Sequence, residues 1–196
     1  HEMTLPCDEP KCMTERAEYY SVKGEKAKAK ECYLKALAMN MTPEQKVNTY
    51  VSFAKFLSDE KDWGTSAEYY YMAAEAKKQI AGETEDYIQL IYNAAIRMFI
   101  GKQYEKSLAH YNMVVSFYES NNLKASQKSI ALCRKGMGNV LSAMKDYAHA
   151  KVEFLKSLDY YAKEEPQSEN HASLIERLAT AEKFNKDYDS SIAHYQ

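Results

Sequence analysis

The stretch AIRMFIGKQYEKSLAHY, residues 95–111, carries a five-position signature that recurs along the chain. A small residue is followed three places later by a large, usually apolar residue and nine places later by a mostly aromatic one. Ala or Ser stands twelve places after the small residue, and an aromatic ring stands sixteen places after it. The five copies are Ala17/Tyr20/Lys26/Ala29/Tyr33, Ala54/Leu57/Trp63/Ser66/Tyr70, Ala95/Met98/Tyr104/Ser107/Tyr111, Gly138/Leu141/Tyr147/Ala150/Phe154 and Ala179/Glu182/Tyr188/Ser191/Tyr195. They start 37, 41, 43 and 41 residues apart, and self-similarity at such a period indicates a stacked-repeat solenoid.

The signature also predicts what each repeat contains. Offsets of three, four and seven residues place side chains on one face of an α-helix, so each copy predicts two amphipathic helices. Small residues let the two helices approach, and the aromatic rings fill the space beside them. One such hairpin cannot bury its own apolar stripe, so neighbouring hairpins must stack. We therefore predict an all-α fold, with a loop segment at 1–10 and a single solenoid at 11–196. Its five repeats span about 11–43, 44–82, 83–126, 127–167 and 168–196, and the last is cut short within its second helix.

Breaks between the predicted helices carry the expected residues. Gly24 and Gly101 fall between the first and second helices of their repeats, where we predict a left-handed backbone that suits glycine. Thr42, Pro43 and Gln45 combine an N-cap, a first-turn proline and the partner residue of a capping box. Strand signals are nearly absent.

Four stretches of the sequence resemble the tetratricopeptide repeat (TPR) family: residues 24–36, 102–111, 145–154 and 186–195. The family repeat is about 34 residues, whereas three of the four spacings here exceed 40, which adds about a turn to each helix. The chain is similar in this to the longer TPR variant of kinesin light chains and bacterial peptide-responsive regulators, and to sensor segments of some bacterial histidine kinases and transcription factors. The resemblance implies a right-handed superhelical solenoid of antiparallel helix pairs that binds peptides or proteins.

The same resemblance implies where a ligand would lie. The first helices of a TPR superhelix line its concave face, and Asn suits that face because its amide donates to and accepts from a peptide backbone at once. Apolar residues there would form a pocket for an anchoring side chain; the alternative is that they contact neighbouring helices. The predicted groove residues are Asn48, Ser52, Lys55, Gln89, Tyr92, Asn93, Ile96, Phe99, Lys135, Asn139 and Arg177.

Other classes of site find little support in the sequence. Gly136 and Gly138 begin like a dinucleotide fingerprint, but the third glycine and the preceding strand are missing. Close helix packing around Gly138 explains the pattern better. No P-loop, metalloprotease motif or nucleophile elbow occurs, and the histidines are scattered, so we predict no cofactor, no metal and no enzymatic activity. A net charge of −2 gives no general attraction to nucleic acid. The lysines of the first repeat are interleaved with glutamates and are expected on a solvated helix face, and no apolar run is long enough to span a membrane.

Four cysteines bear on the compartment. Cys7 and Cys12 flank a predicted loop, where a disulfide is sterically possible and two free thiols are the alternative. A disulfide would favour a periplasmic or extracellular setting, so the sequence leaves the compartment open between these and the cytoplasm. Cys32 and Cys133 fall within predicted helices as small core residues.

Three interpretations of function follow. The sequence favours a protein- or peptide-binding scaffold, as the sensing or interaction part of a longer regulatory protein. A structural segment that mediates self-association is the alternative. An enzyme with an unrecognised site is the third and is disfavoured, because no titratable residues converge in the predicted groove.

Overall fold

The computed structural model describes the backbone of residues 6–121 and 126–195, and side chains as far as Lys186. Regular structure in these ranges is helical throughout, which confirms the predicted all-α class. The chain forms two compact units, His1–Gly101 and Lys102–Gln196. Their boundary falls inside the third predicted repeat, so the division of one solenoid into five repeats stays a prediction.

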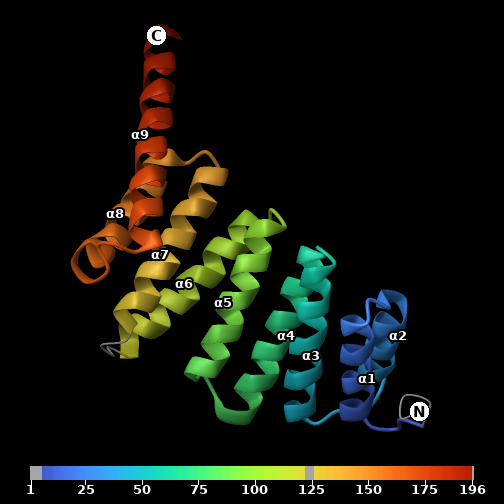
Figure 1. The fold of residues 1–196 in the computed structure, drawn as a ribbon. Coiled ribbons are helices and arrows are strands. Elements are labelled where there is room, and N and C mark those ends of the chain that lie inside the picture. The colour runs from blue at the N-terminus through green and yellow to red at the C-terminus, as the bar shows by residue number, and fades with distance from the viewer. Residues whose placement is uncertain (1–5, 122–125, 196) are drawn as a thin grey trace. The chain divides into compact units, whose positions relative to one another are not determined.

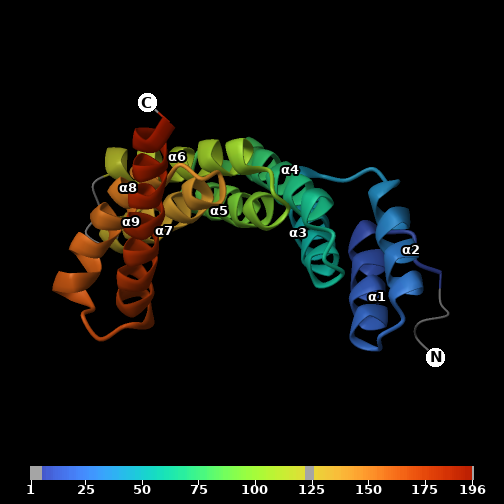
Figure 2. The same cartoon turned by 90° about the horizontal axis from the view of Figure 1, so that it is seen from above.

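The first unit contains five helices within its described residues. They are α1 (Pro10–Val22), α2 (Lys26–Leu37), α3 (Pro43–Asp59), α4 (Trp63–Ala81) and α5 (Glu85–Ile100). Helix α1 packs on α2, α3 on α4, and α4 on α5, and α1 also contacts α3 directly. Figures 1 and 2 show α1–α2 and α3–α4 as antiparallel hairpins.

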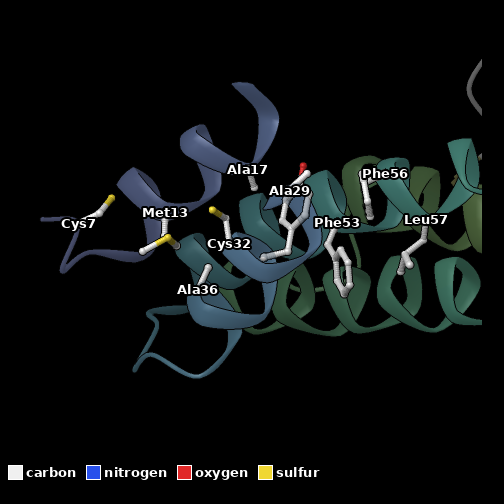
Figure 3. Packing of buried hydrophobic residues seen from close by; sticks show 10 residues of the cluster. Cys7, Met13, Ala17, Ala29, Cys32, Ala36, Phe53, Phe56 and Leu57 are labelled. Atoms are coloured by element: carbon white, nitrogen blue, oxygen red, sulfur yellow. The ribbon is translucent and has the colours of Figure 1, made fainter. Parts of the chain in front are cut away.

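The core of the first two hairpins joins small residues to aromatic rings. Ala17 and Ala29 are fully buried, and the ring of Tyr33 lies 5.0 Å from that of Phe53, centroid to centroid. Figure 3 shows Phe53 beside Phe56 and Leu57 along α3. Ala17, Ala29 and Tyr33 of the first copy are therefore packed as predicted, whereas Tyr20 is half-buried and Lys26 is exposed.

The second unit contains α6 (Tyr104–Asn121), α7 (Ser126–Ala143), α8 (Tyr147–Glu164) and α9 (Glu169–Tyr195) among its described residues. Each of these helices packs on the one that follows it. The rings of Phe154 and Tyr161 on α8 are fully buried, together with Leu174 on α9.

Two glycines of α7 let aromatic rings approach the helix backbone. A β-carbon on Gly138 would lie 2.4 Å from Cε1 of Phe154, the final aromatic of the same signature copy. A β-carbon on Gly136 would lie 2.6 Å from Cζ of Tyr111, the final aromatic of the preceding copy. The structure thus confirms close packing at Gly138 and adds Gly136, which the sequence had not singled out.

The turn between first and second helices has the same geometry in four copies. The residue seven places after the small residue adopts a positive φ: Gly24, Lys61, Lys102 and Lys145, at 78°, 61°, 63° and 64°. At Lys145 the flanking hydrogen bonds, Lys145 N–H to Ser142 O and Asp146 N–H to Leu141 O, are those of a Schellman motif. The prediction for Gly24 is confirmed.

The prediction of a left-handed Gly101 is wrong. Gly101 caps α5 with a φ of −78°, and the next residue, Lys102, takes the left-handed conformation. A glycine at position 101 is favoured by packing instead, because a β-carbon there would lie 3.2 Å from the β-carbon of Trp63. The predicted capping box at Thr42 is confirmed, with Thr42 and Gln45 exchanging both of its hydrogen bonds at 3.0 and 3.2 Å.

The fifth copy departs from the others. We expected a turn near Lys186, but α9 runs unbroken from Glu169 to Tyr195. Ala179, whose counterparts in the other four copies are buried, is therefore exposed. A physical reason lies at Glu182, which replaces an apolar packing residue and pairs instead with Lys151 of α8 at 3.3 Å. The later signature positions Tyr188, Ser191 and Tyr195 lie outside the side chains that the structure describes.

The structure contains a disulfide between Cys7 and Cys12, whose Cα atoms lie 5.7 Å apart. Cys7 is buried and belongs to the first core cluster together with Met13 and Cys32 (Figure 3). Cys32 and Cys133 are free and buried, as predicted. Burial raises the pKa of the Cys133 thiol to about 12.

We expect Gly138→Ala to destabilise the chain by up to about 2 kcal/mol. Overpacking against Phe154 costs roughly 1–3 kcal/mol, and the gain in helix propensity offsets about 1 kcal/mol of it. Urea unfolding measures the change. Adding Phe154→Leu should recover part of the loss, with a coupling of at least about 0.5 kcal/mol; strict additivity would contradict the contact.

Lys145→Gly should stabilise the chain by about 0.5–1 kcal/mol. A left-handed lysine costs roughly 1–2 kcal/mol, and the added backbone entropy of glycine returns about 0.5–1 kcal/mol of that gain. The matched control is Lys30→Gly in the middle of α2, which should destabilise by about 1 kcal/mol. Equal destabilisation by both substitutions in urea unfolding would show that the turn imposes no such conformation.

Candidate functional site

A groove between α1 and α3 of the first unit is lined by three of the predicted residues, Asn48, Ser52 and Lys55. Its larger part is a cavity of about 620 Å³, and a cavity of about 260 Å³ adjoins it nearer the N-terminal ends of both helices. Glu18 and Asn48 line both parts, so we treat them as one α1–α3 groove. The larger part is lined by Glu18, Ser21, Val22, Tyr33, Val47, Asn48, Val51, Ser52, Lys55, Phe56 and Asp59.

Two consecutive hydrogen bonds join side chains of α1, α2 and α3 in the wall of the groove. Ser52 Oγ donates to Glu18 Oε1 at 2.7 Å, and it lies 2.7 Å from the hydroxyl of Tyr33. Ser52 has a single proton, which goes to the carboxylate, so the Tyr33 hydroxyl must donate to Ser52. Burial raises the pKa of Tyr33, which keeps this donor protonated. These hydrogen bonds fix the Glu18 carboxylate, and its second oxygen makes no hydrogen bond to the described residues.

Three other polar side chains line the groove without a partner among the described residues. Among the described residues, Asn48, Lys55 and Asp59 make no hydrogen bond or ion pair through their side chains. Apolar surface lies beside them, because Val22 is 90% exposed and Val51 is half-buried. The α1–α3 groove therefore offers free polar groups next to a small aliphatic surface.

The floor between α1 and α3 is closed by a buried contact. The hydroxyls of Thr14 and Thr49 lie 3.0 Å apart, and both residues are almost fully buried. Each satisfies the other, so neither is left as an unpaired polar group in the core. This contact holds the two first helices side by side beneath the groove.

The predicted residues of α5 do not line the groove. Gln89 is exposed, and Tyr92, Asn93, Ile96 and Phe99 are half-buried on that helix. The Asn93 amide is used within the chain, since Nδ2 donates to Gln89 O at 2.9 Å and Oδ1 accepts from Arg97 Nη1 at 2.9 Å. We therefore leave Asn93 out of the proposed contact surface.

Arg97, which donates to the Asn93 amide oxygen, belongs to a network that joins three helices. Its guanidinium lies 4.6 Å from the ring centroid of Tyr70, and its Nε donates to Ser58 Oγ at 3.2 Å. Ser66 donates to the Ala54 carbonyl at 2.7 Å, so Ser58 donates to Ser66 across the 2.7 Å between their hydroxyls. The network links α3, α4 and α5 and fixes the position of α5 in the first unit.

The second unit brings two predicted cations near each other. Lys135 Nζ donates to Asn170 Oδ1 at 3.0 Å, and burial and then the nearby Arg177 lower the pKa of Lys135. Arg177 Nε donates to Ser173 Oγ at 3.2 Å and lines a cavity of about 420 Å³ with Phe184. Asn139 does not line that cavity, and its Oδ1 is buried without a hydrogen-bond partner. The predicted groove residues therefore do not form one site: those of α3 line the α1–α3 groove of the first unit, and Arg177 lines a cavity in the second unit.

Sequence reasoning missed Glu18, Val22 and Asp59 in the groove. It also missed the hydrogen bond by which Arg97 engages Asn93 on α5. A signal for two of the groove residues was present, because Glu18 and Val22 lie four residues apart on the first helix of the first repeat. Our groove prediction began at the second repeat and so passed over that helix. Asp59 ends α3 one turn after Lys55 and follows from the same spacing.

The chemistry expected of other sites is not assembled in the described part of the chain. No group of three or more His, Cys, Asp or Glu side chains there is arranged to hold a metal ion. Within the same residues, no helix is both long enough and apolar enough to cross a membrane. Three lysines of α2 are paired, Lys26 with Glu60 at 2.9 Å, Lys28 with Glu25 at 2.6 Å and Lys35 with Glu31 at 2.8 Å, as expected of a solvated face.

Comparison with solved structures supports the fold. No protein-family model and no curated protein sequence matches the chain. BtubC (BKLC) from P. vanneervenii matches at a TM-score of 0.66 and 16% identity, over 93% of this chain and 75% of that one. A putative kinesin light chain with nearly identical TPR-like repeats from Podosopora anserina matches at 0.67 and 12%, over 98% and 92%. The apo form of RapI matches at 0.66 and 15%, over 95% and 67%. The chain has a TPR-like helical-repeat fold, as predicted.

Proposed function

We propose that this chain is a protein- or peptide-binding scaffold that acts as the sensing or interaction part of a regulatory protein. The observation that carries the proposal is the α1–α3 groove, where Asn48, Lys55 and Asp59 lie unpaired beside exposed aliphatic surface. Unpaired polar groups at a concave site fix a ligand's orientation, and the apolar surface supplies contact area. The fold likeness supports this class of function by analogy only.

The groove suits an extended segment rather than a compact small molecule. It runs along two parallel first helices, from Lys11 and Gln45 at one end to Val22 and Asp59 at the other. A segment laid along it would meet the Asn48 amide near the middle, where one side chain can donate to and accept from its backbone. Val22 and Val51 would contact an apolar side chain beside that point.

The test is selection from a random peptide display library against the 196-residue chain, followed by calorimetry of the selected peptides. The double substitution Val22→Ser with Asn48→Ala removes the aliphatic contact and the amide without adding charge, and it should weaken binding about tenfold or more. One lost hydrogen bond removes about 0.5–1.5 kcal/mol, the lost aliphatic contact adds to it, and 1.4 kcal/mol is tenfold in affinity. Both residues are exposed, so the melting temperature should stay nearly unchanged.

A matched control makes the same two chemical changes elsewhere. Val152→Ser on α8 and Asn40→Ala between α2 and α3 alter exposed residues that do not line the groove. This control should bind the selected peptides as the unaltered chain does. Equal binding by the groove variant and the control would place peptide recognition outside the α1–α3 groove and overturn the proposal.

Self-association is a second candidate, favoured by the exposed face of α9. Ile175 is 50% exposed on that face, whereas its counterpart Ile91 is fully buried, and Ala179 is exposed one turn later. A second copy covering this face would make the mass measured by light scattering rise with protein concentration. Ile175→Asp should then hold the chain at the monomer mass, and Thr180→Asp should not. A monomer mass at all concentrations would exclude this candidate.

A further inference from the structure

The hydrogen bonds of the α1–α3 groove leave it short of donors on its α1 side. The single proton of Ser52 goes to Glu18, and the Tyr33 hydroxyl donates to Ser52. Beside Ser52, the second oxygen of Glu18 makes no hydrogen bond to the described residues, and a carboxylate oxygen can only accept. A ligand group at this position must therefore be a donor.

A second carboxylate stands in the same cavity. Asp59, in the last turn of α3, lines it with no hydrogen bond or ion pair of its own among the described residues. Burial is the main cause of the raised pKa of Tyr33, and the charges of Glu18 and Asp59 raise it further, so both carboxylates lie near its hydroxyl. Asp59 also lies near Lys26 of α2 and raises its pKa.

The charge of the cavity favours a cation. Its lining holds two carboxylates, Glu18 and Asp59, against one ammonium, Lys55. Lys55 precedes Asp59 by four residues on α3, which is the weaker order for a helical ion pair, and the two make no ion pair in the structure. An acidic segment would meet the two carboxylates, whereas a basic one would neutralise them.

Apolar surface lies where the stem of a long cationic side chain would run. Val22 closes α1 with 90% of its surface exposed, and Val47 and Val51 are half-buried on α3. Lys and Arg bury their methylene stems on such surfaces while the charged head seeks a polar partner. The guanidinium of Arg has five donors in a planar fork and can pair with a carboxylate through two of them.

We propose that the α1–α3 groove recognises a peptide or protein segment through an Arg or Lys side chain, whose head pairs with Glu18 and Asp59 and whose stem lies on Val22 and Val51. This inference rests on the proposed function and adds the chemical class of the ligand. Asn48, one turn from Ser52 on the same helix, binds the backbone next to the cationic residue. An acidic segment is the excluded class.

The experiment uses peptides selected from the random display library and measures their affinity by calorimetry. The double substitution Glu18→Gln with Asp59→Asn removes both charges and keeps an acceptor for Ser52. It should weaken the selected peptides about tenfold or more, and replacing their Arg or Lys by citrulline or norleucine should weaken them equally. The substitution in the protein should have little further effect on those neutral peptides.

The matched control, Glu68→Gln with Asp159→Asn, removes the same charge from exposed positions outside the groove. It should leave affinity unchanged, which separates the local carboxylates from the overall charge. Melting temperatures of both variants close to that of the unaltered chain show that they remain folded.

Two other results have distinct meanings. The first is that the selected peptides depend on Val22 and Asn48 but either carry no cationic residue or tolerate the loss of both carboxylates. That result would overturn this inference and leave the proposed function in place. Peptides that depend on neither pair of residues would overturn both.

Discussion

The close approach of an aromatic ring to a small residue sixteen places earlier is the constraint on which the structure depends. At Gly138 the approach is so close that no β-carbon fits beneath Phe154, and the alanines at the same position of three other copies are fully buried. Any larger side chain would push the second helix away from the first. The helices would then lose the contacts that bury their apolar stripes.

The turn between the two helices sets this spacing. A left-handed residue seven places after the small one ends the first helix and reverses the chain, and its flanking hydrogen bonds satisfy the carbonyls at the helix end. Three of these residues are lysines rather than glycines, so the packing of the hairpin must offset their backbone strain. In α9 the turn is absent and Ala179 stays exposed, which shows that the turn and the burial of the small residue occur together.

Much of the fold could be predicted from the sequence because its determinants are short-range and repeated. The signature marked both helices of the first four copies. The first small residue, the later Ala or Ser and the final aromatic are buried in each of these copies. Gly101 was misassigned because composition suggested a left-handed glycine, whereas the helix end places that conformation one residue later, at Lys102. The unbroken α9 was missed because the signature identified Glu182 only by position and gave no weight to its charge.

Part of the candidate site could also be predicted from short-range patterns in the sequence. Helical periodicity placed Asn48, Ser52 and Lys55 on one face of α3, where the structure finds them in one cavity. Periodicity does not say which side chains are already engaged, so it could not show that Arg97 takes up the Asn93 amide. It also could not show that Ser52 fixes Glu18 from another helix, because that contact joins residues 34 positions apart in the sequence.

The central claim is that peptide recognition resides in the α1–α3 groove, and NMR titration tests it most directly. The ¹⁵N-labelled chain would be titrated with a library-selected peptide while the backbone amide shifts are followed. We predict that the largest changes lie in the C-terminal half of α1 and along α3 from Val47 to Asp59. Changes centred on α2, α4 or the helices of the second unit, with α1 and α3 unperturbed, would contradict it.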